Sequence, residues 1–170
     1  MSMKSMMIGE AYVGEGVDAA HLNLMLGPRD GPVGQAFANA LAAPRMGYIP
    51  FMAVVRPNVP ATPATLFVSK GDLRGPVHEK LVWGPAQLGV ARGITEALVE
   101  GDLPAEAEHN WVAIAAVWVS WDAADADAVY SNNHQATRMA VRRALSTASE
   151  RETLARFASH PLNSYYQPKD

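Results

Sequence analysis

The sequence predicts an α/β or α+β domain in which a largely antiparallel sheet of about four or five strands packs against two long helices and a shorter one. The segment 19–29 supplies one strand pattern, because Ala and Leu side chains alternate with His21, Asn23 and Met25 and so fall on opposite faces. The segment 111–121 supplies a second, because a run rich in Ala and Val is typical of a central strand. The order of strands and helices does not match a doubly wound nucleotide-binding fold.

The first part of the chain predicts a hairpin followed by a helix. Residues 8–13 alternate weakly, and the glycine-rich turn at 14–16 leads into the strand at 19–29. A helix is expected over 33–42, where the apolar side chains share one face. Pro32 then lies in the first helical turn, where its missing N–H costs little.

Two further strands and two helices are expected in the middle of the chain. Residues 48–55 and 65–69 are apolar strand segments, and the proline-rich stretch between them predicts an extended loop. Residues 76–82 predict a short helical piece. A long helix is expected over 84–99, with Gly101 as its C-terminal cap.

The remainder of the chain predicts mostly helix. Asp122 is expected to cap a helix that runs to about residue 145. Asn132 and Asn133 are expected to interrupt this helix, and helical potential continues over 146–158.

Composition indicates a globular protein and excludes several functional classes. Apolar residues make up 49% of the 170 residues and charged residues 18%, which suits one domain over 1–170 with loose ends at 1–7 and 159–170. The net charge of -3 gives no electrostatic case for nucleic acid. No apolar run approaches the roughly 18 residues of a membrane span. Without a secretory signal, we expect a cytoplasmic protein. The absence of cysteine excludes disulfides and thiolate catalysis.

Several polar residues are candidates for chemistry, and each has an ordinary alternative. His21 suits proton transfer because its side chain titrates near neutrality, but it also suits a wet sheet surface or a subunit interface. Lys70, at a strand end, suits an anionic group or is a common surface lysine. Gln87, in the first turn of its helix, suits an amide that reaches past the sheet edge.

No metal site is predicted. The five histidines are scattered along the sequence. Asp122, Asp125 and Asp127 lie close together, but on a helix they span more than one face, so we interpret them as complements to the helix dipole.

Taken together, the motifs resemble those of a known family. In order along the chain they are Ile8-Gly9-Glu10-Ala11-x-Val13-Gly14, Ala20-His21-x-x-Leu24, Gly27-Pro28-Arg29, Ala53-Val54-Val55-x-Pro57-Asn58, Thr65-Leu66, Gly84-Pro85-Ala86-Gln87-x-Gly89-Val90-Ala91 and Ala136-Thr137. Their order and spacing resemble the formaldehyde-activating enzymes of methylotrophic bacteria over residues 8–145, and more loosely as far as residue 161.

The resemblance implies a fold, a reaction and an assembly. The fold is α+β, of the ribosomal protein S-five domain two-like type, with a mainly antiparallel sheet packed against helices. Family members condense formaldehyde with tetrahydromethanopterin, a cosubstrate, to give methylene-tetrahydromethanopterin and water, with no metal or prosthetic group. They are cytoplasmic homopentamers that bind the pterin between neighbouring subunits. The match makes His21 the proton donor, and makes Lys70, Gln87 and Met52 pterin contacts, Met52 replacing a leucine of similar volume.

Two positions depart from the family pattern at the implied substrate site. Asn23 stands where the family has an aspartate, and Asp72 stands where it has a threonine. Asp72 either pairs with Lys70 or repels an electron-rich edge of the substrate. Three functions therefore stay open: a working formaldehyde-activating enzyme, a paralogue that binds or senses a pterin or formaldehyde adduct without turnover, and a lyase that acts on a different amine.

Overall fold

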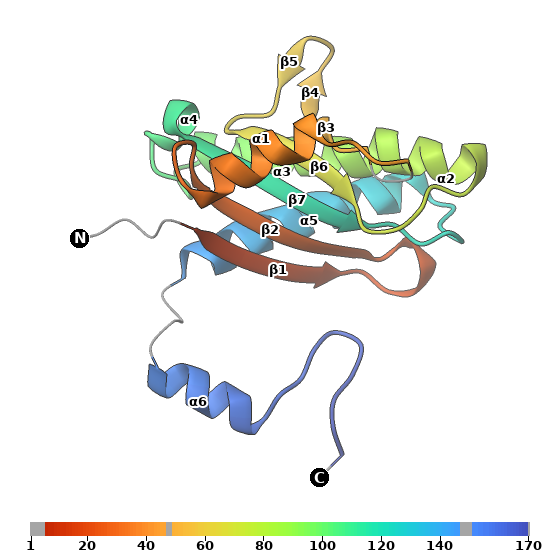
Figure 1. Cartoon of the computed structure of the whole chain (residues 1–170). Helices are drawn as coiled ribbons and strands as arrows, with labels where there is room; N and C mark the ends of the chain where they lie inside the picture. Colours follow the sequence, from red (N-terminus) through yellow and green to blue (C-terminus); the bar gives the residue numbers. More distant parts are fainter. Residues whose placement is uncertain (1–5, 47–48, 147–150, 170) are drawn as a thin grey trace.

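Five strands form one mixed sheet in the part of the chain that the computed structural model describes, residues 6–46, 49–146 and 151–169. In sheet order the strands are β1 (Met7–Val13), β2 (Ala20–Pro28), β7 (Trp111–Trp118), β6 (Ala64–Ser69) and β3 (Phe51–Met52) (Figure 1). Neighbouring strands are antiparallel except β6 and β7, which are parallel. The predicted sheet is therefore confirmed, with one parallel pair.

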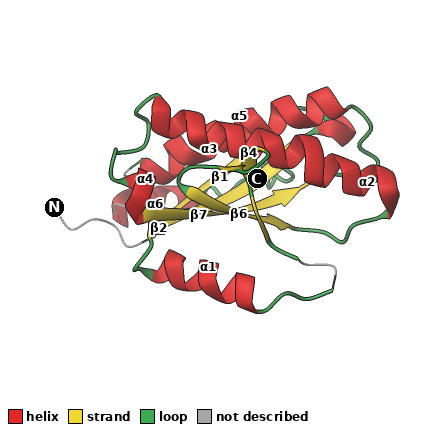
Figure 2. Ribbon diagram, turned by 90° about the horizontal axis from the view of Figure 1, so that it is seen from above, coloured by secondary structure: helices red, strands yellow, loops and turns green. Residues whose placement is uncertain are grey.

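Helices cover both faces of this sheet. The long helices α3 (Gln87–Val99) and α5 (Ala126–Leu145) lie along one face, and α1 (Pro32–Ala42) lies along the other (Figure 2). The aliphatic face of β2 supplies the main core, because Leu22, Leu24 and Leu26 are fully buried in one cluster with α3 and α5. The opposite face of β2 is therefore the face on which α1 packs.

The β1–β2 hairpin forms as predicted. Gly14 has a φ of 86°, a left-handed conformation that a glycine adopts without strain, and the one-turn helix Gly16–Asp18 completes the connection. Gly9 on β1 allows a close approach to α5, because a Cβ atom at this position would lie 1.9 Å from the carbonyl oxygen of Ala140. The β1–β2 hairpin is thus held directly against α5.

The predicted strand at 48–55 and the loop after it are organised differently. Tyr48, the first residue of that prediction, lies outside the described residues. The rest divides between β3 and β4 (Val54–Arg56), and β4 pairs with β5 (Val59–Pro60) in a hairpin that projects from the body (Figure 1). Asn58 makes this turn possible, because asparagine tolerates its left-handed φ of 62°.

Three predicted features of the helices are wrong. The cap of α5 is Asp125 rather than Asp122, because the Asp125 carboxylate accepts hydrogen bonds from the backbone N–H groups at the start of the helix. The expected interruption at Asn132 and Asn133 is absent, since their amides donate to the carbonyls of Asp18 and Val129 and leave the helix intact. The third feature is the start at residue 84. There α2 (Gly75–Leu81) continues through a π-helical turn, Val82–Ala86, into α3.

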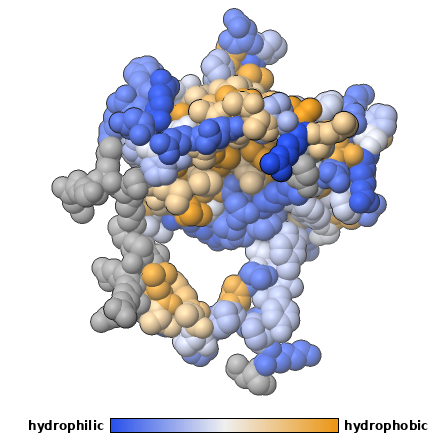
Figure 3. All heavy atoms as spheres, in the orientation of Figure 1, coloured by the Kyte–Doolittle hydropathy of each residue, from blue (hydrophilic) through white to orange (hydrophobic). Residues whose placement is uncertain are grey.

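Two short helices complete the described chain. The helix α4 (Ala107–Asn110) leads into β7, which ends at Trp118 rather than at residue 121. The C-terminal helix α6 (Arg151–Ser159) lies apart from the sheet (Figure 1) and carries apolar surface (Figure 3). Its Leu154 and Phe157 are each 54% exposed. None of the described helices has the length and apolar character that crossing a membrane requires.

Candidate active site

Four neighbouring strands bring one row of side chains to the α1 face of the sheet. Tyr12 on β1 pairs with His21 on β2, and His21 pairs with Trp118 on β7. Residues that lie directly opposite one another in a sheet share a face. Lys70, the residue after β6, donates its backbone N–H to the carbonyl of Val117 and so lies beside the end of this row. The predicted acid and the predicted lysine, 49 positions apart in sequence, are therefore neighbours.

Both ring nitrogens of His21 have charged partners. Nε2 lies 2.9 Å from Oε1 of Glu10, and Nδ1 lies 3.2 Å from Nζ of Lys70. The Lys70 ammonium also donates to the backbone carbonyl of His21 at 3.3 Å. Because a lysine ammonium only donates, Nδ1 accepts, and the neutral ring then carries its proton on Nε2, from where it donates to Glu10. His21 is thus the middle member of a carboxylate–imidazole–ammonium chain.

Burial and neighbouring charges shift the pKa values of His21 and Lys70. Burial lowers the pKa of His21 below its ordinary value, and the Lys70 ammonium lowers it further, while the Glu10 carboxylate opposes both effects. Burial also lowers the pKa of Lys70 to about 8, again against the attraction of Glu10. The pKa of Lys70 therefore lies closer to neutrality than that of a free lysine, which favours proton transfer from its ammonium to the imidazole.

Two tyrosines lie against the imidazole. The ring centroid of Tyr12 lies 6.2 Å from that of His21. The ring of Tyr165, from the C-terminal segment, lies 5.3 Å from His21 and 5.3 Å from Tyr12, nearly perpendicular to both. The imidazole therefore has aromatic surface beside it as well as charged partners.

Met52 and Gln87 form a second, separate group. The Gln87 amide is buried and bonds to both backbone groups of Val54, accepting from its N–H and donating to its carbonyl. Met52, Gln87 and Val54 line a mostly apolar cavity of about 450 Å³ with Ile49, Phe51 and Trp83. His21 and Lys70 do not line this cavity. Within one chain, the predicted site residues therefore form two separate groups. His21 and Lys70 form an acid–base group, and Met52 and Gln87 form an apolar group.

The two departures from the family pattern lie near the acid–base group. Asn23 pairs with Glu10 across β1 and β2, so its side chain lies on the same face as His21. Asp72 is exposed in the loop after β6, and its backbone carbonyl accepts from the indole of Trp121. Among the described residues no ion pair joins Asp72 to Lys70, which contacts His21 instead.

Comparison with known proteins decides the family. The family model for "Formaldehyde-activating enzyme (Fae)" matches residues 8–162. The chain belongs to the formaldehyde-activating enzyme family. By homology it is a carbon–nitrogen lyase of the Fae type.

Relatives in archaea support the assignment to the Fae family. The chain is 40% identical over 159 residues to 5,6,7,8-tetrahydromethanopterin hydro-lyase of Methanosarcina barkeri, which covers 92% of this chain and 89% of that protein. It is 41% identical over 140 residues to the bifunctional enzyme Fae/Hps of Methanococcoides burtonii, covering 82% of this chain but 35% of that protein. The bifunctional enzyme Fae/Hps of Archaeoglobus fulgidus is 37% identical over 147 residues, covering 86% and 37%. This Fae chain thus spans about a third of the length of the bifunctional relatives.

Glu10 is the site residue that the sequence analysis missed. It appears in the first Fae motif, but its partner is 11 positions away and no local spacing links the two. The hairpin prediction contained the necessary signal. Pairing Tyr12 with His21 places Glu10 opposite Asn23, on the same face as the histidine.

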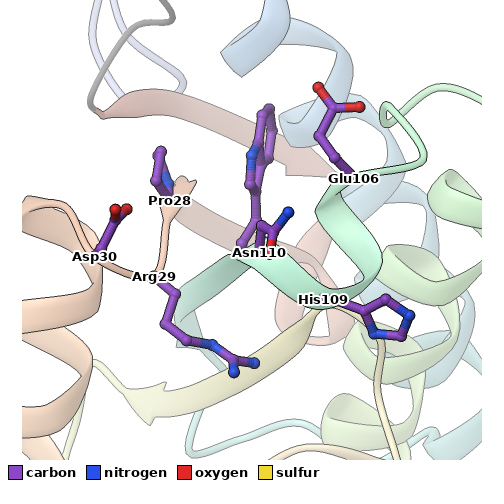
Figure 4. A pocket seen from close by; sticks show the side chains of 7 residues that line it. Pro28, Arg29, Asp30, Glu106, His109 and Asn110 are labelled. Atoms are coloured by element: carbon purple, nitrogen blue, oxygen red, sulfur yellow. The ribbon is translucent and has the colours of Figure 1, made fainter.

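Another cavity lies at the opposite end of β2 from the candidate site. It measures about 590 Å³ and is lined by residues 28–30, Glu106 and residues 109–111. Its charged side chains point in different directions rather than toward one another (Figure 4). None of the predicted site residues of this Fae chain lines it. Within residues 6–46, 49–146 and 151–169, no group of three or more metal-ligating His, Asp or Glu side chains gathers.

Proposed function

We propose that this protein condenses formaldehyde with tetrahydromethanopterin to methylene-tetrahydromethanopterin and water, with His21 as the general acid. The observation that carries the proposal is the position of His21 between Glu10 and Lys70 on the α1 face of the sheet. The name of the Methanosarcina barkeri relative, a tetrahydromethanopterin hydro-lyase, supports the choice of cosubstrate.

The reaction needs a proton at one defined step. A pterin nitrogen attacks the carbon of formaldehyde and gives a carbinolamine. Loss of its hydroxyl group as water requires one proton and leaves an iminium ion. The second pterin nitrogen then attacks this ion, closes the ring and releases a proton, so that one water leaves in all. A positioned acid accelerates the dehydration step, by roughly 10²–10⁴-fold in typical enzymes.

His21 and its partners supply that proton. We propose that Nδ1 of the imidazole receives a proton from Lys70 and passes it to the departing hydroxyl, while Glu10, which accepts from Nε2, stabilises the charged ring. Lys70, with a pKa of about 8, is largely protonated at neutral pH and can return a proton to Nδ1 across 3.2 Å. In this chain Glu10 provides a carboxylate next to the histidine although position 23 is an asparagine.

We further propose that the substrate site is completed between neighbouring copies in a cytoplasmic homopentamer. The acid–base group and the cavity lined by Met52 and Gln87 lie in separate places on one chain. Trp83, in the wall of that cavity, is 53% exposed, so its apolar surface is open to a second copy. One copy then provides His21 and Lys70, and its neighbour provides Met52 and Gln87 to hold the pterin in a reactive orientation.

The deciding experiment is the rate of condensation above the uncatalysed background, for the wild type and for His21→Ala. We expect acceleration by the wild type and a fall of roughly a hundredfold or more in the variant. His109→Ala is the matched control, because this histidine is 80% exposed at the far end of the sheet. Pterin binding without acceleration would indicate a binding or sensing role, and acceleration with another amine alone would indicate a different lyase.

A further inference from the structure

The C-terminal turn at residues 163–166 reaches the candidate acid. The ring of Tyr165 lies 5.3 Å from the His21 ring at an interplanar angle of 77°, and 5.3 Å from the Tyr12 ring at 84°. The neighbouring Ser164 hydroxyl lies 3.5 Å from the Glu10 carboxylate. The turn thus contacts His21, its carboxylate partner and the aromatic residue beside them.

The turn presents Tyr165 in a defined orientation. The side-chain oxygen of Asn163 accepts hydrogen bonds from the backbone N–H groups of Tyr165, at 2.8 Å, and Tyr166, at 2.9 Å. The backbone groups of Asn163 and Tyr166 also pair with each other. An asparagine that satisfies its own turn in this way fixes the backbone locally. Tyr165 is therefore positioned before any ligand arrives.

Tyr165 has aromatic surface left for a ligand. Its perpendicular contacts with His21 and Tyr12 bury part of the residue, and 59% of it stays exposed. An exposed aromatic ring beside a general acid suits the flat ring system of a pterin, because such rings gain contact by stacking. The same ring also excludes water from one side of His21.

We propose that Tyr165 is a substrate-contacting residue, which forms one wall of the His21 site and stacks on the reduced pterin. This inference rests on the proposed function and adds to it a residue that determines the affinity for the pterin. The turn lies beyond residue 162, where the match to the Fae family model ends.

The first test separates pterin affinity from chemistry. Tyr165→Ala is expected to raise the KM for tetrahydromethanopterin by roughly three- to tenfold, the effect of losing one aromatic partner, with kcat nearly unchanged. Tyr165→Phe should keep the wild-type KM, because the ring and not the hydroxyl makes the contact. Tyr166→Ala is the matched control, since its neighbouring ring is 66% exposed and makes no ring contact with His21. An unchanged or lower KM in Tyr165→Ala would overturn the proposal, the lower value indicating a cap that blocks the site.

The second test needs no activity. The ring-proton resonances of His21 are expected to shift in Tyr165→Ala and to stay in place in Tyr166→Ala, because an aromatic ring 5.3 Å away alters the local magnetic field. If the His21 resonances do not move in Tyr165→Ala, the proposal that Tyr165 forms a wall of the His21 site is contradicted. A wild type that does not accelerate condensation would overturn the proposed function alone, and the position of Tyr165 would then be decided by these resonances.

Discussion

At His21, two charges act on one imidazole with opposite sign. Glu10 favours the protonated ring, while Lys70 and burial favour the neutral ring. Single substitutions can therefore separate the contributions of Glu10 and Lys70 to the pKa of His21. The three groups lie on β1, on β2 and just after β6, so their side chains can be substituted one at a time.

The first residue-scale prediction concerns the carboxylate. Glu10→Gln keeps the shape of the side chain but removes the charge that raises the pKa of His21, so this pKa is expected to fall further below its ordinary value. Titration of the His21 ring by NMR measures the change.

Two other variants serve as controls for the carboxylate prediction. Glu15→Gln, in the exposed turn of the hairpin, should leave the titration unchanged. Asn23→Asp should act in the opposite direction, because it adds a carboxylate on the same face and so raises the pKa of His21. Equal pKa values in the wild type, Glu10→Gln and Asn23→Asp would contradict this account of the site.

The second residue-scale prediction concerns pH. If Lys70 returns the proton to His21, kcat/KM should fall as the pH rises through the lowered pKa of His21, and fall again through about 8, the pKa of Lys70, where the ammonium is lost. Lys70→Met should remove the fall of kcat/KM near pH 8. It should also raise the pKa of His21, since a nearby positive charge has gone. A fall near pH 8 that persists in Lys70→Met would show that another group controls it.

Residue-scale reasoning from sequence identified His21 and Lys70 but not their partners. The alternation in β2 predicts the face on which His21 lies, because side-chain direction along a strand is a local property. The contact with Glu10 depends on the register between two strands, which the turn geometry fixes. Gln87 was predicted to reach past the sheet edge, but its amide instead binds the backbone of Val54. These backbone groups come into reach of Gln87 only once the β4–β5 hairpin has folded.

At the scale of elements, the close contact between β1 and α5 ties the site to the core. The backbone of β1 carries Glu10 and Tyr12, and Gly9 lets that backbone touch α5. The position of the hairpin therefore sets the position of the carboxylate.

The element-scale prediction follows from the space at Gly9. Gly9→Ala would place a methyl group 1.9 Å from a backbone oxygen of α5, so β1 or α5 must move. We expect a loss of stability of about 2 kcal/mol or more, in the range of overpacked cores, and a lower melting temperature. Gly84→Ala is the control, because a Cβ atom there meets nothing within 4 Å, and it should melt like the wild type. A Gly9→Ala protein with unchanged stability would show that β1 is not held as described.

Sequence reasoning found most elements but misplaced several ends. Periodicity identifies α1, α3, α5 and the long strands, because each buries one face. The predicted start of α5 was wrong since three aspartates compete as caps, and only the fold decides which carboxylate meets the free N–H groups. The β4–β5 hairpin was missed because its proline residues favour a loop in isolation.

At the scale of the whole molecule, the separation of the two groups predicts complementation between subunits. If His21 of one copy works with Gln87 of its neighbour, co-expression of His21→Ala with Gln87→Ala should give mixed assemblies with some intact sites. Activity should then return above that of either variant alone. Light scattering should give a mass five times the chain's 18.2 kDa. Absence of recovery in mixed assemblies would place the whole site within one chain.

The proposed pentamer is an expectation that comes only from the resemblance to the Fae family. Periodicity reports which side chains are buried, not whether water or another copy covers the rest. Leu154 and Phe157 on α6 illustrate this, because their exposure becomes visible only once the helix is seen apart from the sheet.

The path of the C-terminal turn has a practical consequence for anyone who handles this protein. Residues 163–169 approach the candidate site but add nothing to the buried cluster that holds the sheet. A peptide fused to the C-terminus therefore follows Tyr165 within a few residues of sequence, where its bulk can crowd the approach to His21 while the fold stays intact. The described chain enters β1 at Met7, which pairs with Leu26 at the other end of the hairpin from His21.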